Sequence, residues 1–365
     1  MKKGLALFLA LVILFAPWQA FAQQQTDTTQ MLREAAEGLR SLLQVNHPLS
    51  EEELLPAGDA SGDWTALVFA LAGERADYKA YGKRLESYVT QTYEQRGSLG
   101  AYSATHGQRI VLTAAALGLD PTAFGGSIDL VADSTYDYRQ GDEEIFDQGL
   151  NACIFALLAL DCKNYPVPQG SRYTRESLLS YLLSRQNDDG GFGLTEGDAD
   201  ADVTAMAVQA LAAYTEDEAV NAAAQRALDW LSERQAADGQ FPSRSSETIS
   251  QAIIAVAALG LDPLTEPRFI QNGVTLLNAL EVYRQPDGSF AHSADEAGNV
   301  MATQQAMLAL LALEKQQEGR RLYDFSDLPS PNQSRPLWIR VIVPAGTIAL
   351  SVTVIFTIRR KKKDG

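Results

Sequence analysis

The sequence predicts an all-α fold in which about twelve helices pair into two concentric rings. A Gly-rich turn recurs with its phenylalanines at Phe192, Phe241 and Phe290, and these two successive intervals of 49 residues indicate a repeated helix pair. Apolar helical stretches such as 205–213 alternate with amphipathic ones such as 218–235. A helix that is apolar all round must be covered on every side, whereas an amphipathic helix can face water. The even-numbered helices are therefore expected inside and the odd-numbered ones outside.

The three turns share the pattern Gln…Asp-Gly-x-Phe. Each unit ends one helix in Gln, turns on Asp-Gly where the backbone needs a positive φ, directs an aromatic ring inward and starts a second helix. The rings could line a cavity, but their identical place in each repeat favours packing between helices. The turns are Gln186…Asp189-Gly190-Gly191-Phe192, Gln235…Asp238-Gly239-Gln240-Phe241 and Gln285…Asp287-Gly288-Ser289-Phe290.

Helical spacing and breaker residues predict each element in chain order. The first helix breaks at His47-Pro48, the fourth is closed by Gly118 and Asp120-Pro121, and the fifth has a weak pattern. No stretch of the sequence has a strand pattern long enough to predict a β-strand in place of a helix. The predicted helices span residues 31–45, 63–73, 78–93, 102–119, 124–138, 143–160, 172–185, 201–214, 218–235, 247–260, 267–283 and 299–317.

Both ends of the chain carry apolar segments typical of targeting rather than of the fold. Lys2-Lys3, the apolar run 5–16 and Ala20-Phe21-Ala22 are typical of a secretory signal peptide cleaved after Ala22. The uncharged stretch 341–358 precedes five cations, as in a membrane-spanning helix with a cytoplasmic basic tail. A sortase-type wall signal would need a Thr-Gly pair that 328–332 lacks. The predicted organisation is a signal peptide at 1–22, the helical double ring at 23–325, a linker at 326–337, a transmembrane helix at 338–358 and a cytoplasmic tail at 359–365.

Composition excludes several classes of partner and site. Residues 23–336 carry 22 Lys and Arg against 45 Asp and Glu, so nucleic acid and anionic headgroups are not expected as partners. Nine residues of helix separate Cys153 from Cys162 by roughly 13 Å, too far for a disulfide. The three histidines show no paired spacing, so no metal site and no cofactor is predicted.

The turns, together with the helix start Thr204-Ala205-Met206-Ala207, resemble the repeats of the prenyltransferase and squalene-cyclase-like (α/α)6 toroid family. The resemblance covers roughly residues 30 to 325 and is strongest from residue 140 onward. Within the family, the chain looks most like secreted, surface-anchored bacterial members. The resemblance implies the toroid fold but leaves the activity open, because toroids of this shape serve several chemistries.

Asp200-Ala201-Asp202-Val203-Thr204 is the first candidate for chemistry. It is similar to the Asp-x-Asp-Asp-Thr motif of class II terpene cyclases, which implies that Asp202 is the proton donor and Asp200 the first motif residue. Val203 stands where the family has its last aspartate. A helix N-terminus stabilises a carboxylate anion, whereas a proton donor must be kept neutral. Asp202 is therefore also interpreted as a helix cap.

Acidic or polar residues recur at the predicted starts of the inner helices. If these helices run parallel, the residues form a ring around one mouth of the toroid, as a negatively charged rim over an apolar cavity. The alternative is that each helix receives its preferred acidic start. The candidate rim residues are Asp63, Glu143, Asp202, Glu247 and Asn299.

Three functions remain open at this point. The first is a membrane-anchored extracellular toroid that binds a small molecule or a surface protein in its centre or on the rim. The second is a class II cyclase-like enzyme with Asp202 as the acid. The third is a carbohydrate-active enzyme with paired carboxylates among Asp63, Asp202 and Glu247. Zinc-dependent prenyl transfer is not expected, because the late repeats lack cysteines and have only His292.

Overall fold

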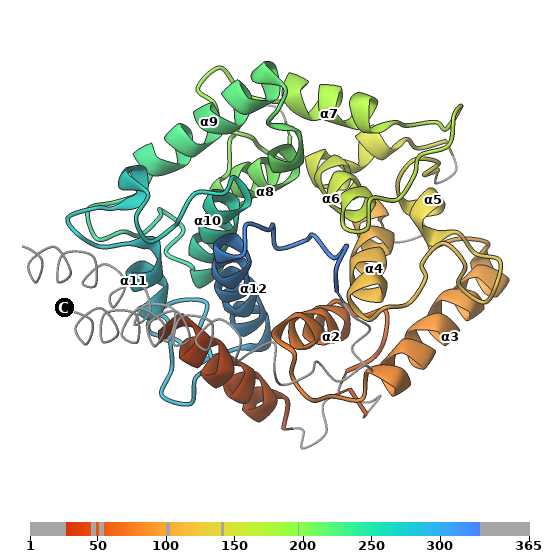
Figure 1. Cartoon of the computed structure of the whole chain (residues 1–365), viewed down its shortest axis with the longest axis horizontal. Helices are drawn as coiled ribbons and strands as arrows, with labels where there is room; N and C mark the ends of the chain where they lie inside the picture. The colour runs from red at the N-terminus through yellow and green to blue at the C-terminus, as the bar shows by residue number, and fades with distance from the viewer. Residues whose placement is uncertain are drawn as a thin grey trace, which may run out of the picture.

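The computed structural model describes residues 27–44, 49–50, 55–99, 103–139, 142–195 and 197–328, which form a closed double ring of helices (Figure 1). Twelve α-helices and no named β-strand occur in this part of the chain, so the all-α toroid prediction is confirmed. No helix of the described residues is long and apolar enough to span a bilayer. The predicted signal peptide and transmembrane helix lie outside these residues.

The inner ring consists of the even-numbered helices, as predicted. Each of them contacts the next one around the ring, and the last contacts the first. Gln304 joins these two helices, because its Nε2 donates to Thr65 Oγ1 at 2.7 Å and to the carbonyl oxygen of Ser61 at 2.9 Å. The inner helices are α2 (Ala60–Ala72), α4 (Ala104–Ala116), α6 (Leu150–Asp161), α8 (Ala201–Leu211), α10 (Ser246–Ala258) and α12 (Val300–Gln317).

The outer ring is less regular than the sequence predicted. The fifth helix has only five residues, and the eleventh is split into a 3-10 turn and a short helix by Asn272 and Gly273, which have φ of 53° and 84°. The outer elements are a helix at 27–43, α3 (Tyr78–Arg96), α5 (Leu130–Ser134), α7 (Arg175–Ser184), α9 (Glu218–Glu233) and α11 (Leu276–Glu281), with 3-10 turns at Ile145–Gln148, Ala212–Tyr214 and Pro267–Phe269.

The repeated turns have the predicted geometry. Gly190, Gly239 and Gly288 have φ of 97°, 79° and 87°, and the aspartate before each glycine accepts a backbone N–H two residues on. The phenylalanines are fully or almost fully buried. They pack between helices as core residues, so the structural interpretation of these rings is confirmed.

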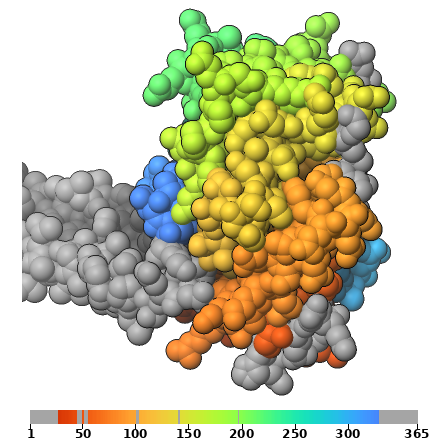
Figure 2. Space-filling model, turned by 90° about the vertical axis from the view of Figure 1, so that its right-hand side faces the viewer, coloured from red at the N-terminus to blue at the C-terminus, as the bar shows by residue number. Residues whose placement is uncertain are grey.

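The double ring has two different mouths. Every inner helix follows an outer one, so the six inner helices run in the same direction and begin at one mouth. At the other mouth, residues 320–328 leave α12 and cross the centre of the ring (Figure 1). Figure 2 shows this blue segment on one face and the light-blue loop between α11 and α12 on the opposite face.

Candidate functional site at the acidic mouth

Asp200, rather than Asp202, caps the N-terminus of α8. Its backbone is extended, and its Oδ1 accepts the N–H groups of Asp202 at 2.9 Å and of Val203 at 3.0 Å. This is the usual geometry of an N-cap aspartate. The interpretation of Asp202 as the cap is therefore wrong, because the cap lies two residues earlier. The carboxyl group of Asp202 does not cap α8.

The Asp202 carboxyl group is held in a setting that favours its neutral form. Burial raises the pKa of Asp202, and the nearby carboxylates of Asp200 and Glu247 act in the same direction. The Thr248 hydroxyl and His292 act against them. The helix N-terminus alone would lower this pKa, so burial and like charges outweigh the helix dipole here.

Glu247 is the second residue of α10, as Asp202 is of α8. Its Oε2 lies 2.9 Å from Nδ1 of His292, and its side chain is only 13% exposed. The backbone holds His292 in place, because its carbonyl oxygen accepts the N–H of Ser246 at 3.1 Å. We call Asp200, Asp202, Glu247 and His292 the acidic mouth.

Among the described residues, eight buried side-chain nitrogen or oxygen atoms lack hydrogen-bond partners, and three of them lie at the starts of successive inner helices. These three are Oδ1 of Asp202, Oε1 of Glu247 and Oδ1 of Asn151, and each belongs to the second residue of its helix. Buried acceptors in folded proteins are nearly always satisfied by protein, water or ligand. The three oxygens at the helix starts are therefore candidates for hydrogen bonds to water or to a ligand.

Glu143 and Asn299 were predicted to share the rim with these residues, but they have other surroundings. Glu143 is exposed in the loop before α6, where its Oε2 accepts from Nε2 of Gln148 at 2.6 Å. The helix predicted from Glu143 begins at Leu150, because a 3-10 turn and the positive φ of Gly149 precede it. Asn299 is the N-cap of α12, and its Oδ1 accepts the N–H of Ala302 at 2.9 Å.

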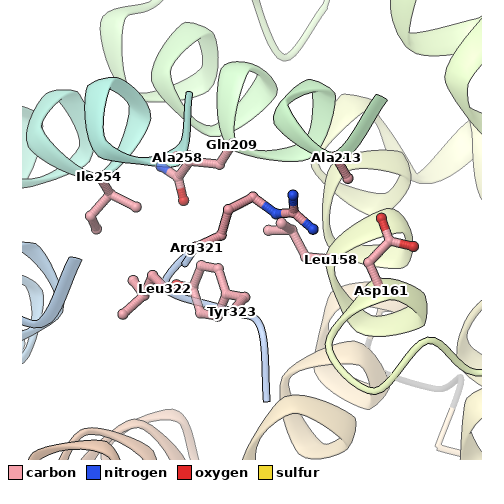
Figure 3. Close-up of a pocket in the computed structure, with 9 residues that line it drawn as sticks. All are labelled: Leu158, Asp161, Gln209, Ala213, Ile254, Ala258, Arg321, Leu322 and Tyr323. Atoms are coloured by element: carbon pink, nitrogen blue, oxygen red, sulfur yellow. The ribbon is translucent and has the colours of Figure 1, made fainter. Parts of the chain in front are cut away.

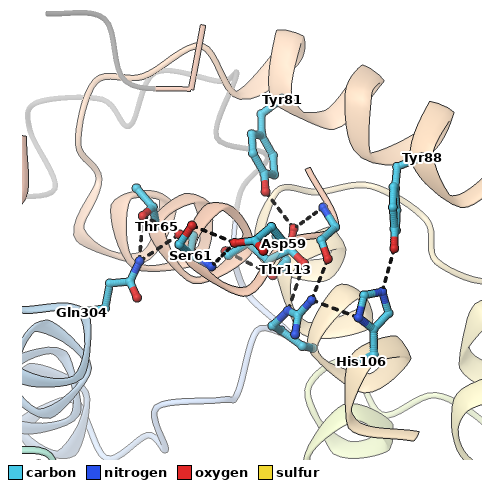
Figure 4. Close-up of polar contacts among 11 residues, drawn as sticks. Asp59, Ser61, Thr65, Tyr81, Tyr88, His106, Thr113 and Gln304 are labelled. Atoms are coloured by element: carbon cyan, nitrogen blue, oxygen red, sulfur yellow. Dashed lines mark hydrogen bonds and ion pairs between the residues drawn. The ribbon is translucent and has the colours of Figure 1, made fainter. Parts of the chain in front are cut away.

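Asp63 is fully buried and lies in a polar network instead of on the rim. Figure 4 shows part of this network, with Tyr81, Tyr88 and His106 labelled. Oδ1 of Asp63 accepts from Tyr81 Oη at 2.7 Å and from the N–H of Gly58 at 3.0 Å, and its Oδ2 accepts from Nε of Arg109 at 3.0 Å. Burial raises the pKa of Asp63, and the Arg109 guanidinium opposes that effect. Asp63 is the fourth residue of α2, so it corresponds in register to Thr204 in α8 rather than to Asp202.

The network continues from Arg109 to a neutral histidine. Arg109 Nη2 lies 2.8 Å from the carbonyl oxygen of Gly58 and 3.3 Å from Nδ1 of His106, whose Nε2 lies 3.1 Å from Tyr88 Oη (Figure 4). Burial and the adjacent guanidinium lower the pKa of His106 to about 4. Every group here has a protein partner, so the network connects α2, α3 and α4 and is not a candidate site.

The sequence analysis missed two polar groups at this end of the ring, His292 of the acidic mouth and Asn151 at the start of α6. His292 stands 45 residues from Glu247, and only the packing of successive repeats brings them together. The 49-residue repeat could have indicated this, because it places the turn of one unit beside the inner helix of the previous one. Asn151 was missed because the start of α6 was placed too early.

Two partly buried aromatic rings meet on the inner side of the ring. Trp64 of α2 and Phe155 of α6 meet edge to face with ring centroids 6.4 Å apart, although α4 separates their helices in the ring. At the mouth opposite the acidic one, a cavity of about 20 Å³ remains, which is room for about one water (Figure 3). It is lined by Leu158, Asp161, Gln209, Ala213, Ile254, Ala258, Arg321, Leu322 and Tyr323.

Among the described residues, no group of three His, Cys, Asp or Glu side chains is arranged to hold a metal ion. Cys153 and Cys162 are unpaired and buried, and burial raises the pKa of each thiol to about 12. Both cysteines therefore act as small core residues rather than as nucleophiles.

One comparison with known proteins, the match to a family model, agrees with the fold. The sequence model of the prenyltransferase alpha-alpha toroid domain matches residues 145–261 and 243–328. Among solved structures, one described as the crystal structure of a protein from Actinoplanes aligns at 19% identity and a TM-score of 0.47. The alignment covers 79% of this chain and 99% of that one. A search of curated proteins gave no match.

Proposed function

Because the chain belongs to the family of the prenyltransferase alpha-alpha toroid domain, we propose that it is a membrane-anchored extracellular toroid that binds a small ligand at the acidic mouth. The ligand class is a compound with ammonium or hydroxyl donors. The observation that carries this proposal is the set of buried acceptor oxygens on Asn151, Asp202 and Glu247 without partners among the described residues.

The charges of the acidic mouth favour a cationic or donor-rich ligand. Three carboxyl groups, on Asp200, Asp202 and Glu247, are accompanied by the single imidazole of His292. An ammonium group beside Asp202 would favour its ionised form and satisfy its free oxygen. A charge-assisted hydrogen bond of this kind contributes about 1.5–3 kcal/mol. An anionic ligand would meet the same carboxylates and be repelled.

The ligand binds at the mouth rather than deep in the ring. The Trp64–Phe155 contact lies on the inner side of the ring next to α4, and the cavity at the opposite mouth holds only about 20 Å³. A triterpene-sized substrate would not fit that space. The second residue of α12, Met301, is 59% exposed, so the start of that inner helix is open to solvent.

The proposed anchor would leave the acidic mouth accessible. The described chain ends at Leu328, after the segment that crosses the mouth opposite the acidic one. A transmembrane helix at 338–358 would then lie on that side. The acidic mouth would face away from the bilayer, toward ligands or surface proteins outside the cell.

A second candidate is acid catalysis by Asp202 on an alkene or epoxide. It is favoured by the raised pKa of Asp202, because a proton donor to a hydrocarbon must be neutral at working pH. Hydrolysis of glycans would use Asp202 with Glu247, because Asp63 is bound to Arg109. Neither reaction explains the free oxygen of Asn151.

Isothermal titration of the full-length protein in detergent with spermidine, choline and glucosamine tests the proposal. We expect at least one of the three to bind, and Asp202→Asn and Glu247→Gln each to weaken that binding about 10-fold or more, which is the loss of one charge-assisted hydrogen bond. Asp198→Asn, an exposed aspartate in the preceding loop, is the matched control and should bind as the wild type does.

The proposal fails if none of the probes binds, or if Asp202→Asn and Glu247→Gln bind as tightly as the wild type. Incubation with squalene and its epoxide tests the second candidate in parallel. A cyclised product that disappears in Asp202→Asn would establish catalysis in place of binding.

A further inference from the structure

The turn between α3 and α4 differs from the later repeated turns in what lies next to its glycine. A Cβ at Gly190 would lie 2.7 Å from the carbonyl oxygen of Arg226 on α9. One at Gly239 would lie 2.9 Å from the side chain of Val274, just before α11. At Gly97, no atom of the described chain lies within 4 Å of that position, apart from its chain neighbours. The later turns are therefore pressed against the next outer element, whereas a gap separates the turn at Gly97 from it.

A tyrosine replaces the glutamine that closes a later turn. Gln186 lies four residues before its turn glycine, and its Nε2 donates to the carbonyl oxygens of that glycine at 2.9 Å and of Ala223 on α9 at 2.8 Å. Tyr93 has the same place relative to Gly97, but its Oη donates to Oδ2 of Asp133 on α5 at 2.7 Å. Helix α5 has only five residues, against 16 in α9. The tyrosine therefore reaches past the turn to a short helix and does not close the gap.

A cavity of about 190 Å³ occupies this gap. It lies between α3 and α5 of the outer ring and the start of α4 in the inner ring (Figure 1). Gly97, Leu99 and Leu130 are part of its wall, and it shares no lining residue with the acidic mouth. The space is much larger than the cavity of about 20 Å³ at the opposite mouth, and it has room for a small organic molecule. We call it the α3–α5 cavity.

The polar groups on the wall of the α3–α5 cavity mainly accept hydrogen bonds. The hydroxyl hydrogen of Tyr93 is used by Asp133, and Ser134 Oγ donates to the backbone carbonyl oxygen four residues earlier at 2.7 Å. Oδ1 of Asp133 and Oδ2 of Asp137 have no hydrogen-bond partner among the described residues. A molecule in the cavity must therefore bring its own N–H or O–H donors.

The charge on the wall favours a cation. Asp133 and Asp137 stand against a single cation, Arg139, among the residues that line the cavity. Partial burial raises the pKa of Asp133, and the carboxylates of Asp129 and Asp137 add to this effect. The Tyr93 hydroxyl acts against them. A nearby ammonium group would favour the ionised form of Asp133, so an ammonium compound suits this wall better than an anion does.

We propose that the α3–α5 cavity binds a small organic ammonium compound that also carries hydroxyl groups. The ammonium group is placed at the carboxylates of Asp133 and Asp137, and the hydroxyl groups donate to Oη of Tyr93 and Oγ of Ser134. The carbon skeleton contacts Leu99. The cavity opens where the later repeats are closed, and the two aspartates determine the class of its ligand. The site is separate from the acidic mouth and does not depend on the function proposed above.

Two probes of equal size test the class of ligand in the full-length wild-type protein. Isothermal titration compares 2-amino-1,3-propanediol (serinol) with 2-methyl-1,3-propanediol, in which a methyl group replaces the ammonium group. We expect serinol to bind at least tenfold more tightly, because only serinol makes charge-assisted hydrogen bonds to the carboxylates. Equal affinities, or no binding of serinol, would overturn the proposal.

Substitutions show whether serinol occupies this cavity. Asp133→Asn and Asp137→Asn keep an acceptor for the bonds within the chain, and each should weaken serinol binding about tenfold or more. Asp129→Asn is the matched control, because Asp129 belongs to the same stretch but does not line the cavity, and its effect should stay below about threefold. The mouth variant Asp202→Asn should retain serinol binding at Asp133 and Asp137. Loss of binding in Asp202→Asn with none in Asp133→Asn would place serinol at the acidic mouth and refute the proposal. If neither cavity variant folds, as judged by circular dichroism, the Asp202→Asn result decides.

Discussion

At the scale of single residues, the Asp63–Arg109 pair is a buried ion pair whose carboxylate has no exposure. Removing one partner of such a pair leaves the other charge uncompensated in the interior, at a cost of about 3–5 kcal/mol. We therefore expect Asp63→Asn to lower the free energy of unfolding by about that amount in urea titrations. Asp198→Asn, at an exposed position, should change it by less than about 0.5 kcal/mol. A near-zero effect of Asp63→Asn would show that Tyr81 and Gly58 alone hold α2 on α3.

For Asp202 we expect the opposite effect, namely that its replacement by asparagine stabilises the protein. Its pKa is raised in the folded state, so the native protein binds more protons than the unfolded chain above the ordinary pKa of 3.8. The contribution of Asp202 to stability is thus greatest at low pH and is lost as the pH rises through the folded pKa. Asp202→Asn, which keeps the neutral shape, should raise the melting temperature at pH 8, with the gain vanishing toward pH 3.

The control for this experiment is the cap of the same helix. Asp200→Asn should leave the melting temperature nearly unchanged, because asparagine caps a helix as well as aspartate does. A melting temperature of Asp202→Asn that stays below the wild type at every pH would mean that the Asp202 carboxylate stabilises the fold, and that the acidic mouth is structural.

At the scale of elements, the repeated turn depends on glycine for both its backbone angle and its space. Gly190 has φ of 97°, and a Cβ there would lie 2.7 Å from the carbonyl oxygen of Arg226 on α9. Gly190→Ala should therefore destabilise the protein by more than about 2 kcal/mol. Gly260 has φ of 75° with open space around its Cβ position, so Gly260→Ala should cost only about 1–2 kcal/mol. Chemical denaturation measures the loss of stability in each variant. Equal losses would show that the close approach of Arg226 adds nothing to the cost at Gly190.

The same turns explain what could be predicted from the sequence. Asp189-Gly190 and its two copies specify their geometry locally, through a positive φ and a carboxylate that accepts a neighbouring N–H. The fold class and most inner helices follow from such local rules. The start of α6 does not, because the N–H of Ile145 is held by the distant Tyr173 hydroxyl at 3.2 Å, and the 3-10 turn there replaces the helix predicted from Glu143.

The candidate site was only partly predictable for a related reason. Asp202 and Glu247 stood out as acidic residues at helix starts, and both lie at the acidic mouth. Asp63 was chosen by the same rule, but two positions along a helix turn a side chain by roughly 200°. That rotation points the Asp63 carboxylate toward Tyr81 of the outer ring. An acidic residue near a helix start can therefore face either the mouth or the outer ring, and residue type alone does not show which.

At the scale of the whole molecule, the ring is closed where the helix at 27–43 lies against the last repeat. Gly38 on this helix faces the turn of that repeat, and a Cβ there would lie 2.3 Å from the backbone nitrogen of Ser289. Alanine is normally favoured over glycine in a helix by about 1 kcal/mol. Here we expect Gly38→Ala to destabilise the protein by about 1–3 kcal/mol, because backbone atoms must move. Hydrogen exchange should show the extra opening in residues 27–43.

The matched control is a helical glycine with flexible neighbours. A Cβ at Gly82 of α3 would lie 3.3 Å from the side-chain methyl groups of Leu119, which can shift. Gly82→Ala should therefore be neutral or slightly stabilising in the same assay. Stabilisation by Gly38→Ala as well would mean that the helix at 27–43 does not press against the last repeat in solution.

The bond from Gln304 to the carbonyl oxygen of Ser61 spans 243 residues, and this sets the order in which the molecule can be completed. Synthesis proceeds at about 5–20 residues per second, so the partner of α2 appears roughly 12–50 s after α2 itself. During that interval the growing arc has two uncovered apolar edges, one at each end. A nascent chain of this shape needs either a chaperone to cover those edges or export before folding, and a protein arrested before α12 should aggregate.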